Sequence, residues 1–293
     1  MKPAPFNYCR PGHLDEVLAA LFKYENEGRI LAGGMSLGAM LNMRLARPKV
    51  IIDINHVAGI DKIQLINDHI VIGALVRQAV ALVDASVVAH APLLARALPN
   101  VGHYQTRNRG TVVGSVAHAE PSAEIPLALL VSRGYIELAS CRGKRRIAAN
   151  DFFISTLVTA RRPNEFISAI SLPIRKPRTG YAFNEFAIRH GDFAVVAAAC
   201  QLSLSQHGKV NELVLGFSGI ADRSILINAD RYCGISCDVI SPADVASDSV
   251  EQVSPREDLH ATAAFRRQLV RVLTGRVVAT ALSEARDESK NHA

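Results

Sequence analysis

The chain has 293 residues, of which 49% are hydrophobic, and its 33 Lys and Arg against 27 Asp and Glu give a net charge of +6. This length allows two domains, and this composition supplies a packed core and excludes a disordered chain. No apolar run approaches the roughly 20 residues that span a bilayer, and residues 1–5 hold no hydrophobic signal region, so we expect a soluble, cytoplasmic protein without a transmembrane segment.

The charge and cysteine patterns exclude two further classes. The basic clusters lie in separate turns and one helix without interleaved aromatic residues, which argues against nucleic-acid binding and favours solvated faces or contacts with an acidic partner protein. The five cysteines are scattered and lack the Cys-x-x-Cys spacing of a zinc or iron–sulfur site. We therefore expect no metal site on this chain and no thiolate-bound cofactor.

Helix and strand signals alternate at the start of the chain. Apolar residues at three-and-four spacing predict an amphipathic helix over residues 13–27, ended by Gly28. A short strand at 30–31, a helix over 36–45 and a buried strand over 50–54 follow. These elements predict a first subdomain over about residues 1–56.

A second subdomain is expected over residues 57–175. Alternating residues around Asn67-Asp68 predict a hairpin, and a helix with one interruption before Pro92 follows. Thr111-Val-Val is expected to be extended and to turn at Gly114. The remaining predicted elements are a helix over 122–131, paired strands over 134–139 and 145–148, and a strand over 165–172.

The segment 173–180, with two prolines, a glycine and three cations, is the expected linker between two domains, 1–175 and 180–293. Beyond it, three strands predict an antiparallel sheet, and one apolar face of a long C-terminal helix is expected to cover that sheet. The fold class is therefore α+β. The three strands are predicted over 181–187, 193–205 and 210–219, and the helix face consists of Phe265, Leu269, Val272, Leu273, Val277 and Leu282.

Two turns rich in glycine and serine have matching chemistry although they lie far apart in the chain. Ala32-Gly-Gly-Met-Ser36 follows a strand and precedes a helix that begins near Leu37, so its backbone N–H groups suit a phosphate. Thr111-Val-Val-Gly-Ser115 also combines a glycine and a serine in a turn, and it suits the same kind of ligand. Two such loops imply one extended ligand held between them, whereas either loop alone is a weak signal.

Read together, the two loops resemble the flavin loops of the FAD-binding medium subunit of the xanthine dehydrogenase and carbon monoxide dehydrogenase family, the molybdenum hydroxylases. The resemblance covers the whole chain. It implies a p-cresol methylhydroxylase-type FAD-binding domain followed by a smaller C-terminal domain. Its further motifs are Phe6-Asn-Tyr8, Arg10-Pro11, Arg107-Asn-Arg-Gly-Thr111 and Arg189-His-Gly-Asp-Phe193.

The resemblance also implies a set of FAD contacts. Glu124 matches the family's acidic residue that reaches the adenosine ribose. An equally good interpretation is that Glu124 is an exposed glutamate in the first turn of a helix, where the helix dipole favours a negative charge. Arg189 would stabilise negative charge on a reduced flavin ring, and Phe193 would cover one face of it. Phe166 and Ile167 would pack the ring from the first domain. The cofactor-binding set is completed by Ala32, Gly33, Gly34, Met35, Ser36, Leu37, Thr111, Gly114, Ser115 and His118.

No catalytic residue is expected, because no Ser, Cys or carboxylate joins the histidines into a triad. The resemblance implies that substrate is oxidised at a molybdenum cofactor on a large subunit. Electrons would then pass through the [2Fe-2S] clusters of a small subunit to FAD on this chain and on to an external acceptor. The resemblance also implies that the complex is a dimer of heterotrimers. A flavin-poor scaffold subunit of the same complex is the alternative, and a stand-alone oxidase lacks a substrate base.

Two positions depart from the family pattern. Val113 stands where glycine is common, and Met35 stands where histidine or glutamine is common. A β-branched residue would weaken flavin binding if the position required a positive φ.

Overall fold

A small parallel sheet begins the fold in this computed structural model, which describes residues 2–291. Strand β3 (Val50–Asp53) lies between β1 (Asn7–Cys9) and β2 (Gly28–Leu31). Helix α1 (Leu14–Tyr24) turns a buried apolar face toward the core, as its spacing predicted. The predicted last turn is a 3-10 helix, Glu25–Glu27, and Gly28 begins β2.

A five-stranded antiparallel sheet forms the centre of the first domain. Strand β10 (Phe166–Pro173) lies in its middle, between two hairpins. Each hairpin consists of two strands that follow one another in the sequence. The β4–β5 hairpin was predicted correctly, and Asn67 adopts φ +53° in its turn. The remaining strands are β4 (Ile63–Ile66), β5 (His69–Gly73), β6 (Tyr135–Ser140) and β7 (Gly143–Ala148).

Short helices connect the two hairpins. The predicted helix over 79–98 is three helices, because Asp84 accepts hydrogen bonds from the N–H groups of Ser86 and Val87 and starts a new helix there. The helices are α3 (Gln78–Val83), α4 (Ala85–His90), α5 (Pro92–Ala97), α6 (Tyr104–Arg109), α7 (Val112–His118), α8 (Glu124–Val131) and α9 (Ala149–Phe152).

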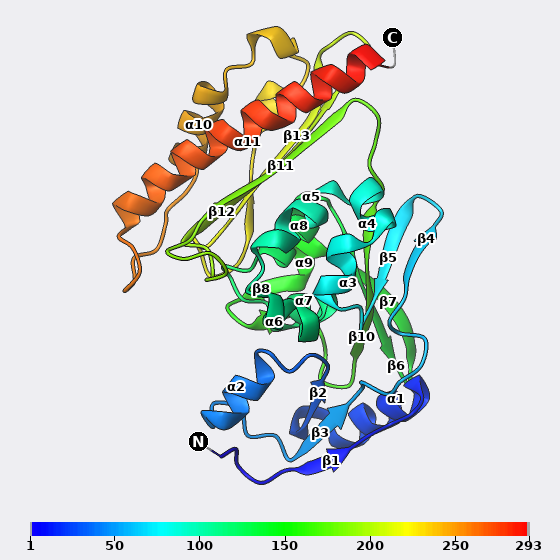
Figure 1. Ribbon diagram of the computed structural model, residues 1–293. Helices are drawn as coiled ribbons and strands as arrows, with labels where there is room; N and C mark the ends of the chain where they lie inside the picture. The colour runs from blue at the N-terminus through cyan, green and yellow to red at the C-terminus, as the bar shows by residue number, and fades with distance from the viewer. Residues whose placement is uncertain (1, 292–293) are drawn as a thin grey trace.

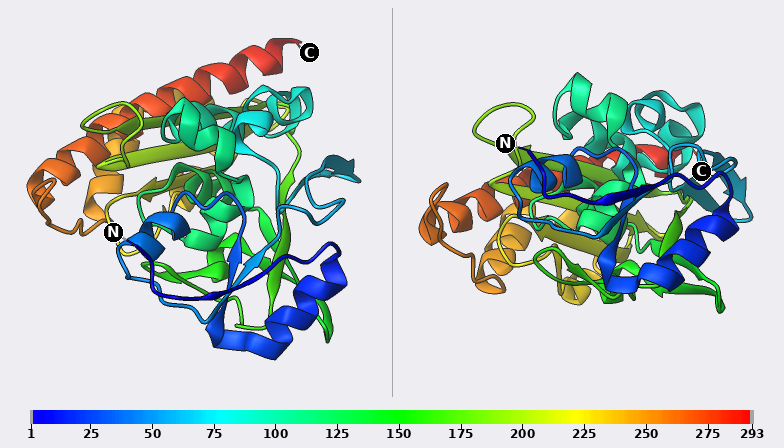
Figure 2. Two further views of the ribbon diagram at one scale, coloured as in Figure 1. Left: turned by 60° about the horizontal axis from the view of Figure 1, so that its bottom comes forward. Right: turned by 90° about the horizontal axis from the view of Figure 1, so that it is seen from below.

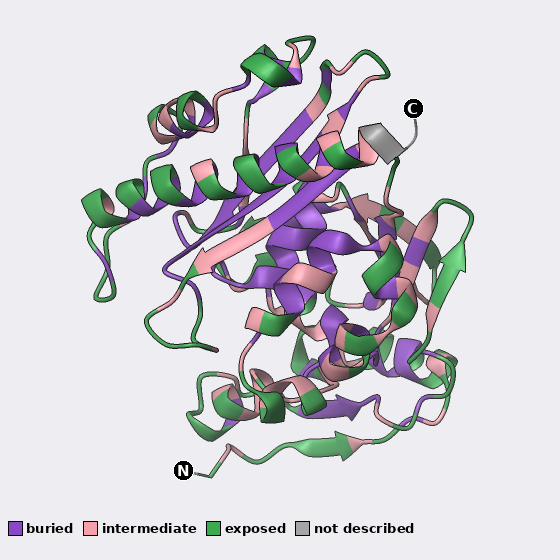
Figure 3. Ribbon diagram, turned by 45° about the horizontal axis from the view of Figure 1, so that its top comes forward, coloured by how far each residue is buried: buried purple, intermediate pink, exposed green. Residues whose placement is uncertain are grey.

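Helix α8 is buried on every side and joins the two domains. Every one of its residues is buried, which accounts for its almost wholly apolar sequence (Figure 3). Leu127, Ala128 and Val131 share a core cluster with Tyr181 and Val214 of the C-terminal sheet. The sheet therefore packs on α5 and α8 with one face.

The C-terminal sheet has four strands instead of the three predicted, because a short strand pairs with the outer edge of β13. Helix α11 (Ala263–Asn291) crosses the other face of this sheet, at the opposite end of the molecule from the N-terminal subdomain (Figures 1 and 2). Phe265 and Val272 do not belong to its buried face, being 44% and 37% exposed. The strands are β11 (Thr179–Phe186), β12 (Val196–Leu204), β13 (Val210–Ser218) and β14 (Ile225–Ile227).

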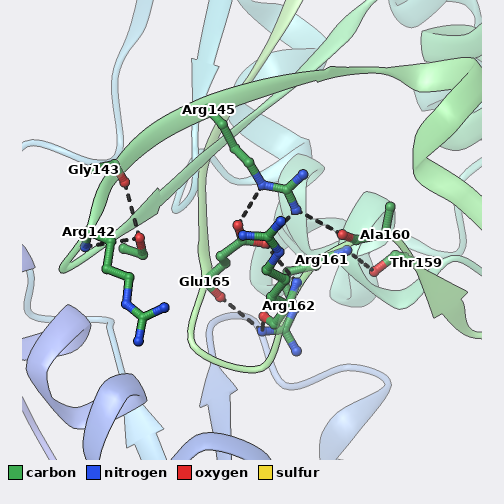
Figure 4. A network of polar contacts seen from close by, with 9 residues as sticks. Arg142, Gly143, Arg145, Thr159, Ala160, Arg161, Arg162 and Glu165 are labelled. Carbon is green, nitrogen blue, oxygen red and sulfur yellow. Dashed lines mark hydrogen bonds and ion pairs between the residues drawn. The ribbon is translucent and has the colours of Figure 1, made fainter.

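A buried carboxylate ties the loop before β10 to β7. Glu165 is 4% exposed and accepts two hydrogen bonds from Arg145, at 2.5 and 2.7 Å, and one from the Arg162 N–H at 2.7 Å (Figure 4). Arg161 donates to the carbonyl oxygens of Arg162, Pro163 and Glu165 in the same loop. Burial alone would raise the pKa of Glu165, but these hydrogen bonds outweigh it and lower that pKa.

The other elements are short, apart from helix α10, which packs on α11. None of the helices in the described part of the chain is long and apolar enough to cross a membrane. These elements are α10 (Pro242–Glu251), β8 (Phe153–Ser155), β9 (Val158–Thr159) and the 3-10 helices Leu98–Asn100, Asp230–Tyr232 and Cys237–Val239.

Candidate functional site

The first glycine loop touches the backbone that leads into the second. A Cβ atom built on Gly33 would lie 2.3 Å from the carbonyl oxygen of Arg109 and 2.8 Å from Cα of Gly110. Real Cβ atoms do not approach backbone so closely, so only glycine permits this packing. The fold thus places Ala32–Ser36 directly beside the backbone that leads into Thr111.

The first loop offers a row of free backbone donors. Gly34 adopts φ +73°, which turns the chain from β2 toward α2 (Leu37–Asn42). Within residues 2–291, the N–H groups of Gly33, Gly34, Met35 and Ser36 donate to no other protein group. Successive N–H groups around a left-handed residue form a concavity that binds anions. A pyrophosphate fits this need, because it would satisfy donors that are otherwise left to solvent.

Helix dipoles contribute little to this site. Ser36 occupies the N-cap position of α2, but its side chain accepts no hydrogen bond from that helix. Helix α2 has 6 residues and α7 has 7, so each carries only a short stack of aligned peptides. The loop amides are therefore the main donors. Leu37 is the first residue of α2, and Met35 is 41% exposed at the loop surface.

The second loop is a helix start, not an extended segment. Thr111 is the N-cap of α7, and its hydroxyl accepts a hydrogen bond from the Gly114 N–H at 2.9 Å. Gly114 has no positive φ, but its Cβ would lie 2.5 Å from Thr111 Oγ1. Val113 lies in the first turn of α7, is 3% exposed and has no positive φ. The prediction of an extended Thr111-Val-Val was wrong, because the threonine cap outweighs the β-propensity of two valines.

Glu124 is buried, which excludes the alternative of an exposed first-turn glutamate. It is 2% exposed at the start of α8, and burial raises its pKa to about 7. Glu185 of β11 lies near it, and burial, followed by the charge of Glu124, raises the pKa of Glu185 to about 8. Glu185 Oε2 is buried without a hydrogen-bond partner in the described chain. Two carboxyl groups from different domains therefore face one buried region.

Four of the predicted contacts are buried to different degrees. Ser115 and His118, both in α7, are half-buried, and burial lowers the pKa of His118, which keeps its imidazole neutral. Phe166 and Ile167 in β10 are 3% and 4% exposed and belong to the main core. Their expected packing against the flavin ring stays a prediction.

The segment from Arg189 to Phe193 reaches the first domain at Gly102 and His103. Gly191 adopts φ +87°, and its Cβ would lie 2.6 Å from the ring of His103. Arg189 is exposed, and Phe193 is 57% exposed ahead of β12. An aromatic ring and a guanidinium are thus free to contact a ligand held between the domains.

A groove of about 590 Å³ opens beside Phe193. Its floor and walls come from both domains. The lining includes Glu120, Ser122, Phe193, Arg256, Asp258 and His260.

The sequence analysis missed two residues that connect the loops, Asn55 and Arg77. Asn55 donates to the carbonyl oxygen of Ala32, and Arg77 donates to both Asn55 and the carbonyl oxygen of Arg109. Asn55 follows the carboxyl end of a buried parallel strand, a common place for ligand-site residues, so it could have been noted. Arg77 carries no comparable signal.

Comparison with known proteins agrees with this arrangement of loops and domains. Residues 4–175 match the family of the FAD binding domain in molybdopterin dehydrogenase, and residues 181–281 match the CO dehydrogenase flavoprotein C-terminal domain. The chain therefore belongs to the FAD-binding subunits of the molybdenum hydroxylases. It is an oxidoreductase subunit, and its cofactor is FAD.

Particular relatives match over the whole chain. The 6-hydroxypseudooxynicotine dehydrogenase complex subunit alpha of Paenarthrobacter nicotinovorans is 35% identical over 302 residues, covering 100% of both chains. The nicotine 6-hydroxylase medium subunit of the same organism is 31% identical, covering 96% of this chain and 99% of the relative.

Solved structures of this family share the fold. Carbon monoxide dehydrogenase from Hydrogenophaga pseudoflava, in a form that lacks the Mo-pyranopterin moiety, superimposes with a TM-score of 0.91 at 27% identity, covering 97% of this chain and 99% of that chain. Quinoline 2-oxidoreductase from Pseudomonas putida 86 gives a TM-score of 0.90 at 31% identity, with the same coverage.

Proposed function

We propose that this chain is the FAD-carrying electron-transfer subunit of a heterotrimeric molybdenum hydroxylase. It would receive electrons from the [2Fe-2S] clusters of a small partner subunit and pass them to an external acceptor. Substrate would be oxidised at the molybdenum cofactor of a large partner subunit. The observation that carries the proposal is the contact of Gly33 with Arg109 and Gly110, which brings the two loops together around free amides.

The residues of the chain have distinct proposed roles. Bound FAD supplies the capacity to accept electrons one or two at a time. The loop Ala32–Ser36 would hold the pyrophosphate, and Thr111, Gly114 and Ser115 would face the same ligand from α7. Glu124 and His118 would lie toward the adenosine end. Arg189 would stabilise negative charge on the ring, and Phe193 would shield one face of it.

Relatives support the assignment of partners. The matched proteins are named as medium subunits or chains of nicotine 6-hydroxylase and carbon monoxide dehydrogenase, and one solved relative is a Cu,Mo-CO dehydrogenase. The proposal includes a p-cresol methylhydroxylase-type fold for residues 1–175 and a separate C-terminal domain over 180–293. A cytoplasmic location and a dimer of heterotrimers complete it as expectations from the sequence.

The visible absorption spectrum of the purified protein, with mass spectrometry of the released cofactor, tests the proposal. We expect a flavin spectrum and a mass equal to that of FAD. Metal analysis of the co-purified complex should find iron and molybdenum on the partners. A colourless protein that takes up no FAD would favour the flavin-poor scaffold. A metal-free protein that oxidises an organic substrate unaided would favour a stand-alone oxidase.

A further inference from the structure

A continuous chain of hydrogen bonds runs from one glycine loop to the other. Asn55 Nδ2 donates to the carbonyl oxygen of Ala32 at 2.9 Å, and Asn55 Oδ1 accepts from Arg77 Nη2 at 2.6 Å. Arg77 Nη1 donates in turn to the carbonyl oxygen of Arg109. The two carbonyl groups belong to the residues just before Gly33 and just before Gly110. The Asn55–Arg77 pair therefore bridges the loops at their bases.

Both members of the pair are held in place. Asp53, which is 8% exposed, accepts hydrogen bonds from the Tyr8 hydroxyl, from Asn55 N–H at 2.9 Å and from Asn55 Nδ2 at 2.6 Å. These bonds fix the Asn55 amide with its oxygen toward Arg77. Burial alone would raise the pKa of Asp53, but the hydrogen bonds outweigh it, so that pKa is lowered and the group stays ionised.

The backbone around Arg77 is attached to the second loop independently of its side chain. Arg77 forms a β-bridge with Thr111, the Gln78 N–H donates to the Gly110 carbonyl oxygen at 2.9 Å, and the Val112 N–H donates to the Val76 carbonyl oxygen at 3.0 Å. The guanidinium then extends from this anchored base toward the first loop. Arginine suits the position because its planar fork donates in two directions at once, which lysine cannot do with the same geometry.

We propose that Arg77, oriented by Asn55, is a positioning residue that fixes the separation of the two loops for FAD. The inference rests on the proposed function. Asp53 is the carboxylate whose charge acts on Arg77, but within residues 2–291 the two form no ion pair, so the guanidinium adds positive charge to the field between the loops. A dianionic pyrophosphate held there would be stabilised by that charge without needing to contact it.

Titration of the full-length protein with FAD and with FMN tests this role in Arg77→Met, Arg77→Lys and Asn55→Ala. We expect FAD affinity to fall about tenfold or more in Arg77→Met and less in Arg77→Lys. FMN has a single phosphate and spans less of the gap, so its affinity should fall less than that of FAD. A structural effect alone would lower the melting temperature without changing the ratio of the two affinities.

Arg223→Met is the matched control. Arg223 also donates to two backbone carbonyl oxygens, those of Phe153 at 2.9 Å and Ile154 at 3.2 Å, but it lies outside the loops. Its loss should leave FAD affinity within about twofold of the wild type. The double variant Arg77→Met with Asn55→Ala should lose no more affinity than Arg77→Met alone, because both residues act in one bridge.

The outcomes separate the two proposals. A wild-type protein that binds no FAD overturns the proposed function and this inference with it. Normal FAD binding by the wild type and by Arg77→Met overturns only the inference, as does an equal loss for FAD and FMN. If Arg77→Met does not fold, the FAD and FMN affinities of Arg77→Lys and Asn55→Ala test the inference in the same way.

Discussion

Glu124 at the start of α8 and Glu185 on β11 place two carboxyl groups from different domains in the same buried region. Burial raises the pKa of Glu124 to about 7, and burial together with the charge of Glu124 raises that of Glu185 to about 8. Like charges in a poorly hydrated place cannot both ionise without cost. The junction between the domains is therefore most stable when both groups hold their protons.

This pair predicts that stability falls as the pH rises. Both acids bind protons more tightly in the folded than in the unfolded chain, so their contribution is complete below about pH 4.5, decreases above it and is lost by about pH 8. Urea unfolding between pH 5 and 8.5 should show this decrease in the wild type. Glu185→Gln should flatten it, whereas Glu251→Gln, at the exposed end of α10, should not. An unchanged slope in Glu185→Gln would contradict the prediction.

Gly33→Ala should separate the glycine loops. The new Cβ would lie 2.3 Å from the Arg109 carbonyl oxygen, and backbone must move to relieve that overlap. We expect a loss of about 1 to 3 kcal/mol in the free energy of unfolding and at least a tenfold loss of FAD affinity. Denaturant unfolding and FAD titration measure the two effects.

Gly275→Ala provides the comparison for that substitution. Gly275 lies within α11, and its Cβ would meet nothing within 4 Å. Alanine there should raise stability by up to about 1 kcal/mol and leave FAD affinity unchanged. Equal effects of the two substitutions would show that the loop contact is unimportant.

Val113→Gly should weaken the fold and give no gain in flavin affinity. Val113 is buried in the first turn of α7, so the change removes core packing and introduces a poor helix former. A loss of about 2 to 4 kcal/mol in the free energy of unfolding is expected. A tenfold gain in FAD affinity would instead show that the valine strains the loop, and would favour the flavin-poor scaffold.

Glu165→Gln should destabilise the first domain by about 3 kcal/mol, because it leaves the Arg145 guanidinium without its buried carboxylate. Glu27→Gln removes one partner of the Lys49–Glu27 ion pair, whose side chains are 72% and 50% exposed, and should cost at most about 1 kcal/mol. Denaturant unfolding of both variants checks the difference. Similar losses would mean that burial of Glu165 adds nothing to the stabilisation that the Glu165–Arg145 pair provides.

Local signals account for the elements that were predicted well and for those that were not. The β4–β5 hairpin followed from Asn67-Asp68 and its alternating flanks, and α1 followed from its apolar spacing. The break at Asp84 and the helix after Thr111 both depend on a side chain capping a helix start. Such a cap competes with propensity and can reverse it, as it did for Val112 and Val113.

The sequence by itself determined the two glycine loops, the alternation of helices and strands and the long C-terminal helix, because each depends on residues close together in the chain. Only the tertiary structure decided that Gly33 meets Arg109, that Asn55 and Arg77 bridge the loops, and that Glu124 lies buried near Glu185. The tertiary structure also decided that β10 lies at the centre of its sheet and that β14 pairs at the edge of the C-terminal sheet. Contacts between distant segments depend on how whole layers pack, and no short stretch of sequence encodes that packing.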